Sequence, residues 1–238
     1  MHKKSVIAAV FLSTLATPSL SQEPAPFGLK HYGHFQKMMH MKKTDGVVDL
    51  AEAASAPHLF GMGAPAHGTG EITLIDGELW LDYGADGLGN AVHAPFDGEQ
   101  AVLLVTAEVS EWREVEVPGD MNEDEMRAFI LTRAAANGID VNAPFPFQLE
   151  GQYFDLDWHV LNGLLAAGSG HELFERVREH QTDNAGRIVG FYSASSQGVF
   201  THPGESWHLH LVIAQEGKAG HVDAVSVRAG TVLKLPVS

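Results

Sequence analysis

The chain has 238 residues, 45% of them hydrophobic and 19% charged, which is the composition of a folded globular protein and not of a disordered one. Its formal net charge of -15 excludes nucleic acid as a partner, because phosphate binding needs a basic face, and disfavours docking on anionic lipid. The expected partner is therefore a small molecule. Because the chain contains no cysteine, a metal ion would have to be held by histidine and carboxylate.

The N-terminus has the pattern of a signal peptide. A basic start is followed by an apolar run, Ser5–Ala16, and by small residues before Gln22. The apolar run is shorter than the roughly 20 residues of a membrane-spanning helix. We expect residues 1–21 to be removed and residues 22–238 to form one exported domain, periplasmic or secreted, with no membrane attachment. Two packed subdomains that meet near residue 140 are the alternative.

The first half of the mature chain is expected to contain a helix, a loop and a hairpin. The predicted elements are a helix at 29–43, a short helix and then a loop rich in glycine, proline and histidine at 45–68, a hairpin at 70–84 and a strand at 101–109. In the hairpin, Asp76-Gly77 is a two-residue turn between alternating runs. The turn places Ile72, Leu74, Leu79, Leu81 and Tyr83 on one face, and Glu71, Thr73, Glu78, Trp80 and Asp82 on the other.

The second half begins with a well-marked helix. Asn122 is expected to cap a helix that runs to Ala136, with Glu125 completing a capping box and Gly138 ending it. After it we expect two short strands around Gly151 within 145–161, a helix at 171–181, a strand at 186–193 and a hairpin at 206–225. This order of elements predicts an α+β fold with mixed or largely antiparallel β-sheets and helices between groups of strands.

Three histidines fall in the last hairpin. His208 and His210 are two residues apart on a strand and therefore point to the same side. If the hairpin loop has an even number of residues, His221 on the returning strand faces that side too, and three imidazoles could share one metal ion. Two solvated histidines on a strand would give the same HxH pattern, so the spacing alone leaves both interpretations open.

Several motifs resemble those of the alpha-acetolactate decarboxylase family, from about His31 to Val225. The family's G-x-G-T loop and L-D-G-E motif are similar to "GMGAPAHGTGEITLIDGELWL", and its GTxVGF strand to "GRIVGFYS". Its P-G-Y-H-x-H and G-G-H motifs are similar to "PGESWHLH" and "AGH". The resemblance implies that His208, His210 and His221 bind zinc or a similar divalent ion. It also implies a proton-relay role for Glu71, and it aligns His159 with the family's active-site arginine.

The chain departs from the family at other site positions. Ala64 stands where the G-x-G-T loop has threonine, His159 is a cation only when protonated, and the chain ends at Ser238 before the family's C-terminal glutamate. Two extra residues lengthen the loop within Glu205–Trp207. The loss of a fixed guanidinium predicts slow or absent turnover of acetolactate and better activity on another oxo or hydroxy acid.

Two functions follow from the sequence. The first is a zinc-dependent carboxy-lyase that converts 2-acetolactate, or a related 2-hydroxy-3-oxo acid, to acetoin and CO2 or the corresponding products. The alternative is an exported, non-catalytic metal- or ligand-binding protein on the same scaffold. A homodimer is compatible with both. A cupin is a third hypothesis, although the spacing from His210 to Glu216 and the following glycines fits its pattern poorly.

Overall fold

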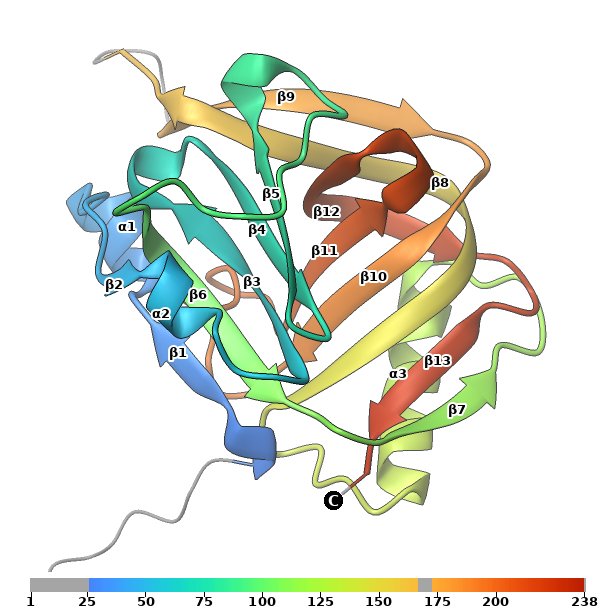
Figure 1. Cartoon of the computed structure of the whole chain (residues 1–238). Coiled ribbons are helices and arrows are strands. Elements are labelled where there is room, and N and C mark those ends of the chain that lie inside the picture. Colours follow the sequence, from blue (N-terminus) through green and yellow to red (C-terminus); the bar gives the residue numbers. More distant parts are fainter. Residues whose placement is uncertain (1–25, 167–172, 238) are drawn as a thin grey trace, which may run out of the picture.

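Two mainly antiparallel sheets, built by different halves of the chain, pack against each other (Figure 1). The computed structural model describes residues 26–166 and 173–237, so the predicted signal peptide lies outside the described residues. Across the described ranges the strands form one six-stranded and one seven-stranded sheet. Strands dominate and helices are few, which confirms the predicted fold class.

The first sheet has the strand order β1-β6-β3-β4-β5, with β2 paired to β6. Its elements are β1 Lys30–Tyr32, α1 Phe35–Met41, β2 Val48–Asp49, α2 Leu50–Ala53, β3 Leu59–Pro65, β4 Gly70–Ile75, β5 Glu78–Tyr83 and β6 Gln100–Glu108. The hairpin β4–β5 has the predicted register, with Ile75 opposite Glu78. Asp76 and Gly77 both have positive φ, as a tight two-residue hairpin turn requires.

The second sheet is organised around one long strand, β8, which curves across the molecule (Figure 1). Its elements are β7 Trp112–Glu116, α3 Glu123–Ala136, β8 Phe145–Leu164, β9 Phe174–Gln181, β10 Asn184–Tyr192, β11 Trp207–Ile213, β12 Lys218–Val227 and β13 Val232–Pro236. The first half of β8 pairs with β10 and the second half with β12, while β11 lies between β10 and β12. These four strands therefore close into a small barrel.

Helix α3 begins and ends as predicted. The Asn122 side chain accepts the Glu125 N–H, and the Glu125 carboxylate accepts the Asn122 N–H, which completes the capping box. Short 3-10 helices, Pro26–Gly28, Ala66–Gly68, Gly84–Asp86 and Ala214–Glu216, connect other elements. Within the described ranges, none of the helices has both the length and the apolar content needed to cross a membrane.

Two of the N-terminal predictions are wrong in part. The predicted helix at 29–43 is β1 followed by the shorter α1, because residues 30–32 pair with β6 instead of joining the helix. The short helix expected within 45–68 is confirmed as α2, but the expected loop contains β3, a strand that is buried along its whole length. The absence of a side chain at Gly63 permits this placement, because a Cβ atom there would lie only 1.9 Å from the backbone oxygen of Leu103.

Two predictions around β8 are also wrong. Gly151 does not divide two short strands. It lies inside β8, where a side chain would meet the Cα of Thr231 at 2.7 Å, so the glycine permits close packing and not a turn. The predicted helix at 171–181 is a strand over its described part, β9, which pairs with the second half of β8. The backbone hydrogen bonds that β8 offers override the helix propensity of the charged residues in this segment.

The two faces of β11 meet different environments. Trp207, Leu209 and Leu211 point into the core that α3 also covers. Val212 points the other way, into the core between the two sheets, together with Phe60 and other residues of the first sheet. Because side chains alternate along a strand, His208 and His210 share the face of Val212. Both histidines therefore lie between the sheets.

Candidate metal centre

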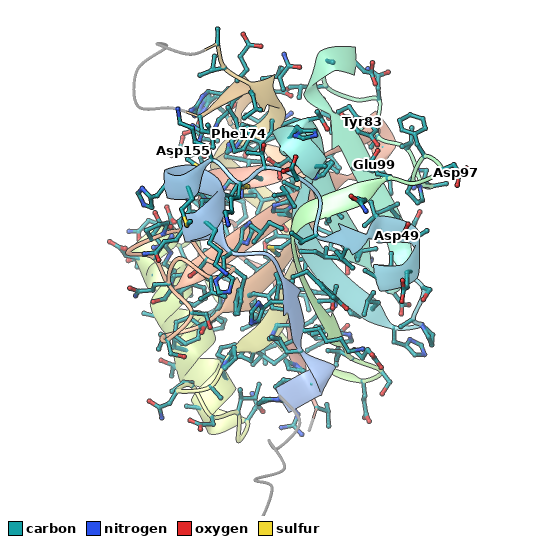
Figure 2. All side chains as sticks on the ribbon, turned by 90° about the vertical axis from the view of Figure 1, so that its left-hand side faces the viewer. Asp49, Tyr83, Asp97, Glu99, Asp155 and Phe174 are labelled. Atoms are coloured by element: carbon teal, nitrogen blue, oxygen red, sulfur yellow. The ribbon has the colours of Figure 1, made fainter. Side chains whose placement is uncertain are left out.

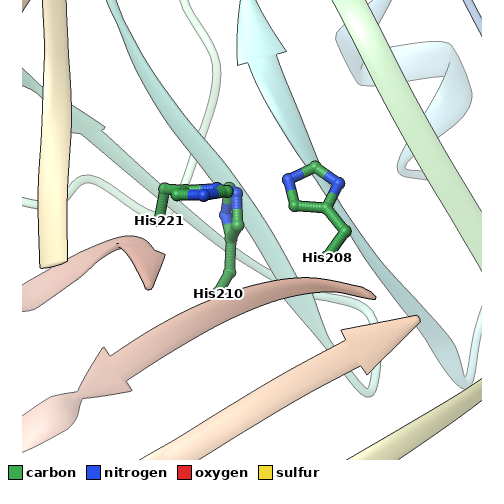
Figure 3. A group of neighbouring side chains, drawn as sticks. All are labelled: His208, His210 and His221. Atoms are coloured by element: carbon green, nitrogen blue, oxygen red, sulfur yellow. The ribbon is translucent and has the colours of Figure 1, made fainter. Parts of the chain in front are cut away.

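His208, His210 and His221 converge between the sheets (Figure 3). All three are buried, and one ring nitrogen from each lies within 4.8 Å of the other two. Their convergence follows from the hairpin register, in which His210 lies directly opposite His221 and the loop consists of residues 214–217. The loop length is even, as the alignment of all three histidines on one side requires.

The outer nitrogens of two of these rings are fixed by hydrogen bonds. His208 Nδ1 lies 2.7 Å from the backbone oxygen of Phe200, and because a carbonyl only accepts, Nδ1 carries the hydrogen. His210 Nδ1 lies 3.1 Å from the hydroxyl of Thr73 on β4. The Phe200 contact leaves His208 Nε2 with its lone pair free, which is the arrangement of metal-binding histidines, and His210 takes the same tautomer when its Nδ1 donates to the Thr73 hydroxyl.

The donor set fits a divalent metal. Among the described residues, His210 Nε2 is a buried polar atom without a hydrogen-bond partner, although it points toward the other two rings. A buried polar atom without a partner is costly in a folded protein. A metal ion at the centre of the triad would satisfy it, and zinc accepts three histidines while keeping further positions open.

Burial controls the protonation of this cluster. Desolvation lowers the pKa of His208 to about 3 and holds the pKa values of His210 and His221 well below their ordinary range, with the neighbouring histidines acting in the same direction. Neutral imidazoles are the form that binds a metal. Desolvation also raises the pKa of Glu71 well above its ordinary value, and a bound cation would oppose that effect.

Glu71 and His159 lie beside the triad. The buried Glu71 carboxylate places Oε2 3.5 Å from His210 Nε2 and Oε1 3.9 Å from His159 Nε2. His159 lies directly opposite His221 on β8, and its Nδ1 lies 2.8 Å from Asp223 Oδ2. The Asp223 carboxylate accepts from this nitrogen, so the imidazole turns Nε2 toward Glu71. Glu78, the other glutamate of the hairpin, is exposed at the turn and lies 3.5 Å from His93.

A small cavity adjoins the triad. Its lining combines polar side chains with apolar residues that come mainly from α1, β3 and β6. The polar lining residues are Glu71, His159, Arg176, His202, His208 and His221, and the other lining residues are Phe35, Met38, Met39, Gly63, Ala64, Leu103, Leu161 and Phe174. The volume, about 30 Å³, holds one or two water molecules. A larger ligand must displace side chains, and Met38 and Met39 are unbranched and adaptable.

Two residues of this cavity escaped the sequence analysis. The ring centroid of His202 lies 5.0 Å from that of His221 and 4.1 Å from that of Phe35, and burial lowers the pKa of His202 to about 4. Its position directly before the Pro-Gly of the matched motif was the available signal. Arg176 was missed because its segment was predicted to be a helix.

Comparison with known proteins points to one family. The family model described as alpha-acetolactate decarboxylase matches residues 33–236. The fold is similar to the crystal structure of alpha-acetolactate decarboxylase from Bacillus subtilis strain 168, with a TM-score of 0.72, 16% identity and coverage of 88% of this chain and 86% of that one. It is also similar to the crystal structure of acetolactate decarboxylase from Bacillus subtilis subspecies spizizenii, with a TM-score of 0.71, 16% identity and the same coverage.

A further structural relative has no assigned function. It is a Staphylococcus aureus protein of unknown function, described as similar to alpha-acetolactate decarboxylase, with a TM-score of 0.65, 14% identity and coverage of 87% of this chain and 84% of that one. At these identities the structural comparisons show a shared fold. No curated protein matches the chain.

Proposed function

The chain belongs to the alpha-acetolactate decarboxylase family, and we propose on that basis that it is a metal-dependent carboxy-lyase. Its substrate would be 2-acetolactate or a related 2-hydroxy-3-oxo acid, and its products a hydroxy ketone and CO2. The observation that carries the proposal is the buried triad of His208, His210 and His221, with Glu71 against it at the edge of a cavity. His210 Nε2 is buried and has no hydrogen-bond partner among the described residues. A histidine cluster with a purely structural role would be expected to pair this atom, whereas a metal site leaves it free for the ion.

The triad would hold Zn²⁺ or a similar divalent ion. Three neutral imidazoles leave coordination positions open for a ligand, as catalytic zinc sites do. When bound, such an ion supplies a Lewis acid for the keto and hydroxyl oxygens of the substrate. The hydrogen bond that His208 donates to the Phe200 carbonyl and the contact of His210 with the Thr73 hydroxyl hold the two rings in the orientation that this role needs.

Glu71 is the residue we assign to proton transfer. In the reaction the bond between the substrate carbon and its carboxylate breaks, the electron pair passes toward the keto oxygen, and a proton is then added to carbon. Glu71 is close enough to the triad to deliver that proton. His159 would orient Glu71, since Asp223 fixes its ring and turns Nε2 toward the Glu71 carboxylate. Asp223 is partly exposed, so this chain of side chains also leads to solvent.

The first experiment measures metal and activity on the same samples. The mature chain from Gln22 onward would be purified, analysed for bound metal and assayed for CO2 release from racemic acetolactate. We expect about one divalent ion per chain. His210→Ala should lose both metal and activity, whereas His180→Ala, at an exposed histidine on β9 paired with Asp157, should keep both. Full metal occupancy in His210→Ala would show that the site is wrongly placed.

Export is a separate part of the proposal. It is supported by the basic, apolar and small-residue segments of residues 1–21. Expression of the full chain in a bacterium with two membranes, followed by fractionation and N-terminal sequencing, tests it. We expect a periplasmic or secreted protein that begins at Gln22. Retention of the intact N-terminus in the cytoplasmic fraction would contradict export.

A further inference from the structure

Strand β9 brings an arginine to the cavity. Its first residue, Phe174, is buried and is labelled in Figure 2. Phe174 packs against Gly68, where a side chain would meet the ring at 2.4 Å, so the start of β9 is held against the first sheet. Arg176 lies two residues further on and directly opposite Leu161 on β8. Residues opposite each other in an antiparallel pair project to the same face, and both Arg176 and Leu161 line the cavity.

Arg176 gives the cavity its fixed positive charge. Among the described residues that line it, Arg176 is the one lysine or arginine. Three of the lining histidines, His202, His208 and His221, do not replace it, because burial lowers the pKa of each and favours the neutral form. The charge acts across the cavity: burial is the main influence on the pKa of Glu71 and raises it, and Arg176 opposes that rise.

We propose that Arg176 binds the carboxylate of the substrate. The inference rests on the proposed function and specifies how an acid would be oriented. A guanidinium can hold a carboxylate with two parallel hydrogen bonds. With its carboxylate at Arg176, a substrate bound in this cavity would bring its keto and hydroxyl oxygens to the histidine triad and its alkyl groups to apolar lining residues such as Met38, Ala64 and Leu103.

This assignment changes the expectation drawn from the sequence. The resemblance aligned the family's arginine with His159, which suggested that the site lacks a guanidinium. In the structure β9 lies beside β8, and Arg176 lines the same cavity as His159 from the neighbouring strand. The site therefore contains a permanent cation, supplied from a different position in the chain. A preference for substrates that carry a carboxylate follows.

The effect of Arg176 should appear mainly in binding. Its partner in the ground state is a carboxylate, but the product CO2 carries no charge, so the contact weakens as the reaction proceeds. An interaction that is no stronger in the transition state than in the ground state lowers KM without raising kcat. We expect Arg176→Gln to raise KM about 10- to 100-fold for an acid substrate, with a smaller change in kcat.

A matched pair of non-reacting ligands tests the proposal directly. In 2,3-dihydroxy-2-methylbutanoate the keto group is reduced, so CO2 cannot leave, and butane-2,3-diol is the same skeleton without the carboxylate. Calorimetry on the zinc-loaded mature protein should show that the acid binds at least about tenfold tighter than the diol. Arg176→Gln should lose this preference while its diol binding, zinc content and melting temperature stay unchanged. Arg187→Gln is the matched control, because Arg187 pairs with Glu150 and does not line this cavity.

Three outcomes would overturn the proposal: a wild-type protein without a preference for the acid, an Arg176→Gln variant that keeps it, or an Arg187→Gln variant that loses it equally. If Arg176→Gln does not fold, Arg176→Lys decides, because lysine keeps the charge but not the planar fork. A weakened preference in Arg176→Lys supports the proposal and an unchanged one contradicts it. Since these ligands do not react, the result is independent of whether wild-type protein releases CO2 from acetolactate.

Discussion

Replacing Thr73 by valine should weaken metal binding without changing any of the three histidines. Thr73 is fully buried on β4, and its hydroxyl lies 3.1 Å from Nδ1 of the equally buried His210. Valine has nearly the same shape but cannot hydrogen-bond, and no water is expected to fit in place of the hydroxyl. The Nδ1 atom then loses the partner that fixes the orientation of the ring, with Nε2 toward the other two histidines.

The magnitude follows from the burial of both groups. Loss of one partner of a buried hydrogen bond costs about 1–3 kcal/mol, and loss of a group that orients a metal-binding histidine typically lowers affinity 10- to 100-fold. The backbone of Ile72 also interacts with the His210 ring, so we expect the lower limit, about tenfold. Competition with a chromophoric chelator measures the zinc affinity. Thr106→Val, at a buried threonine of β6 in the same sheet, is the control and should not change it.

An affinity of Thr73→Val within about twofold of the wild type would refute this reasoning. The first sheet would then have no part in orienting the triad, although it lies directly against it. An equal loss in Thr106→Val would also refute it, because the effect would come from general destabilisation of the sheet and not from the contact with His210.

Three further predictions concern stability. Burial raises the pKa of Asp82 to about 6, above its ordinary value, so the stability that its protonated form contributes is present at low pH and is lost as the pH rises through 6. In urea unfolding, the stability of Asp82→Asn relative to wild type should therefore increase by about 1–3 kcal/mol from pH 4 to pH 7. A difference that stays constant with pH would contradict this prediction. Gly68→Ala should lower stability by about 1–3 kcal/mol, measured in the same way, because Gly68 has φ +62 and its new methyl group would meet Phe174; an unchanged urea midpoint would show that the ring moves freely. Asn122→Ala should cost about 0.5–2 kcal/mol through the lost capping box and leave zinc affinity unchanged, and a change in zinc affinity would show that α3 influences the metal centre.

The sequence by itself determined the elements whose signals are local. The Asp76-Gly77 turn defined the hairpin β4–β5, and the Asn122–Glu125 box defined the start of α3. Each signal depends only on the backbone conformations and hydrogen bonds of a few adjacent residues, so no distant partner is needed to interpret it. The shared direction of His208 and His210 belongs to the same class, because strand alternation fixes it. The position of His221 on the same side was predicted only for an even loop length, which the structure shows.

Glu71 shows where local information became insufficient. It shares one face of the hairpin with Glu78, so the pattern could not distinguish the two, and the family resemblance selected Glu71. In the structure the strand end that carries Glu71 lies beneath the second sheet, whereas the turn that carries Glu78 projects into solvent. The difference is produced by the packing of one sheet on the other, which the hairpin sequence does not encode.

Only the tertiary structure decided which other side chains reach the site. Asp223 on β12 and Arg176 on β9 were not expected there, and they are brought beside His159 of β8, which the family resemblance had named, by strand pairing between segments that are distant in the sequence. The segment of β9 has charged residues at spacings that suit a helix as well as a strand, so its own pattern could not exclude a helix. Its conformation is fixed by the backbone hydrogen bonds that β8 offers and by the burial of Phe174. Because both depend on non-local contacts, the position of Arg176 in the cavity could not be predicted from the sequence.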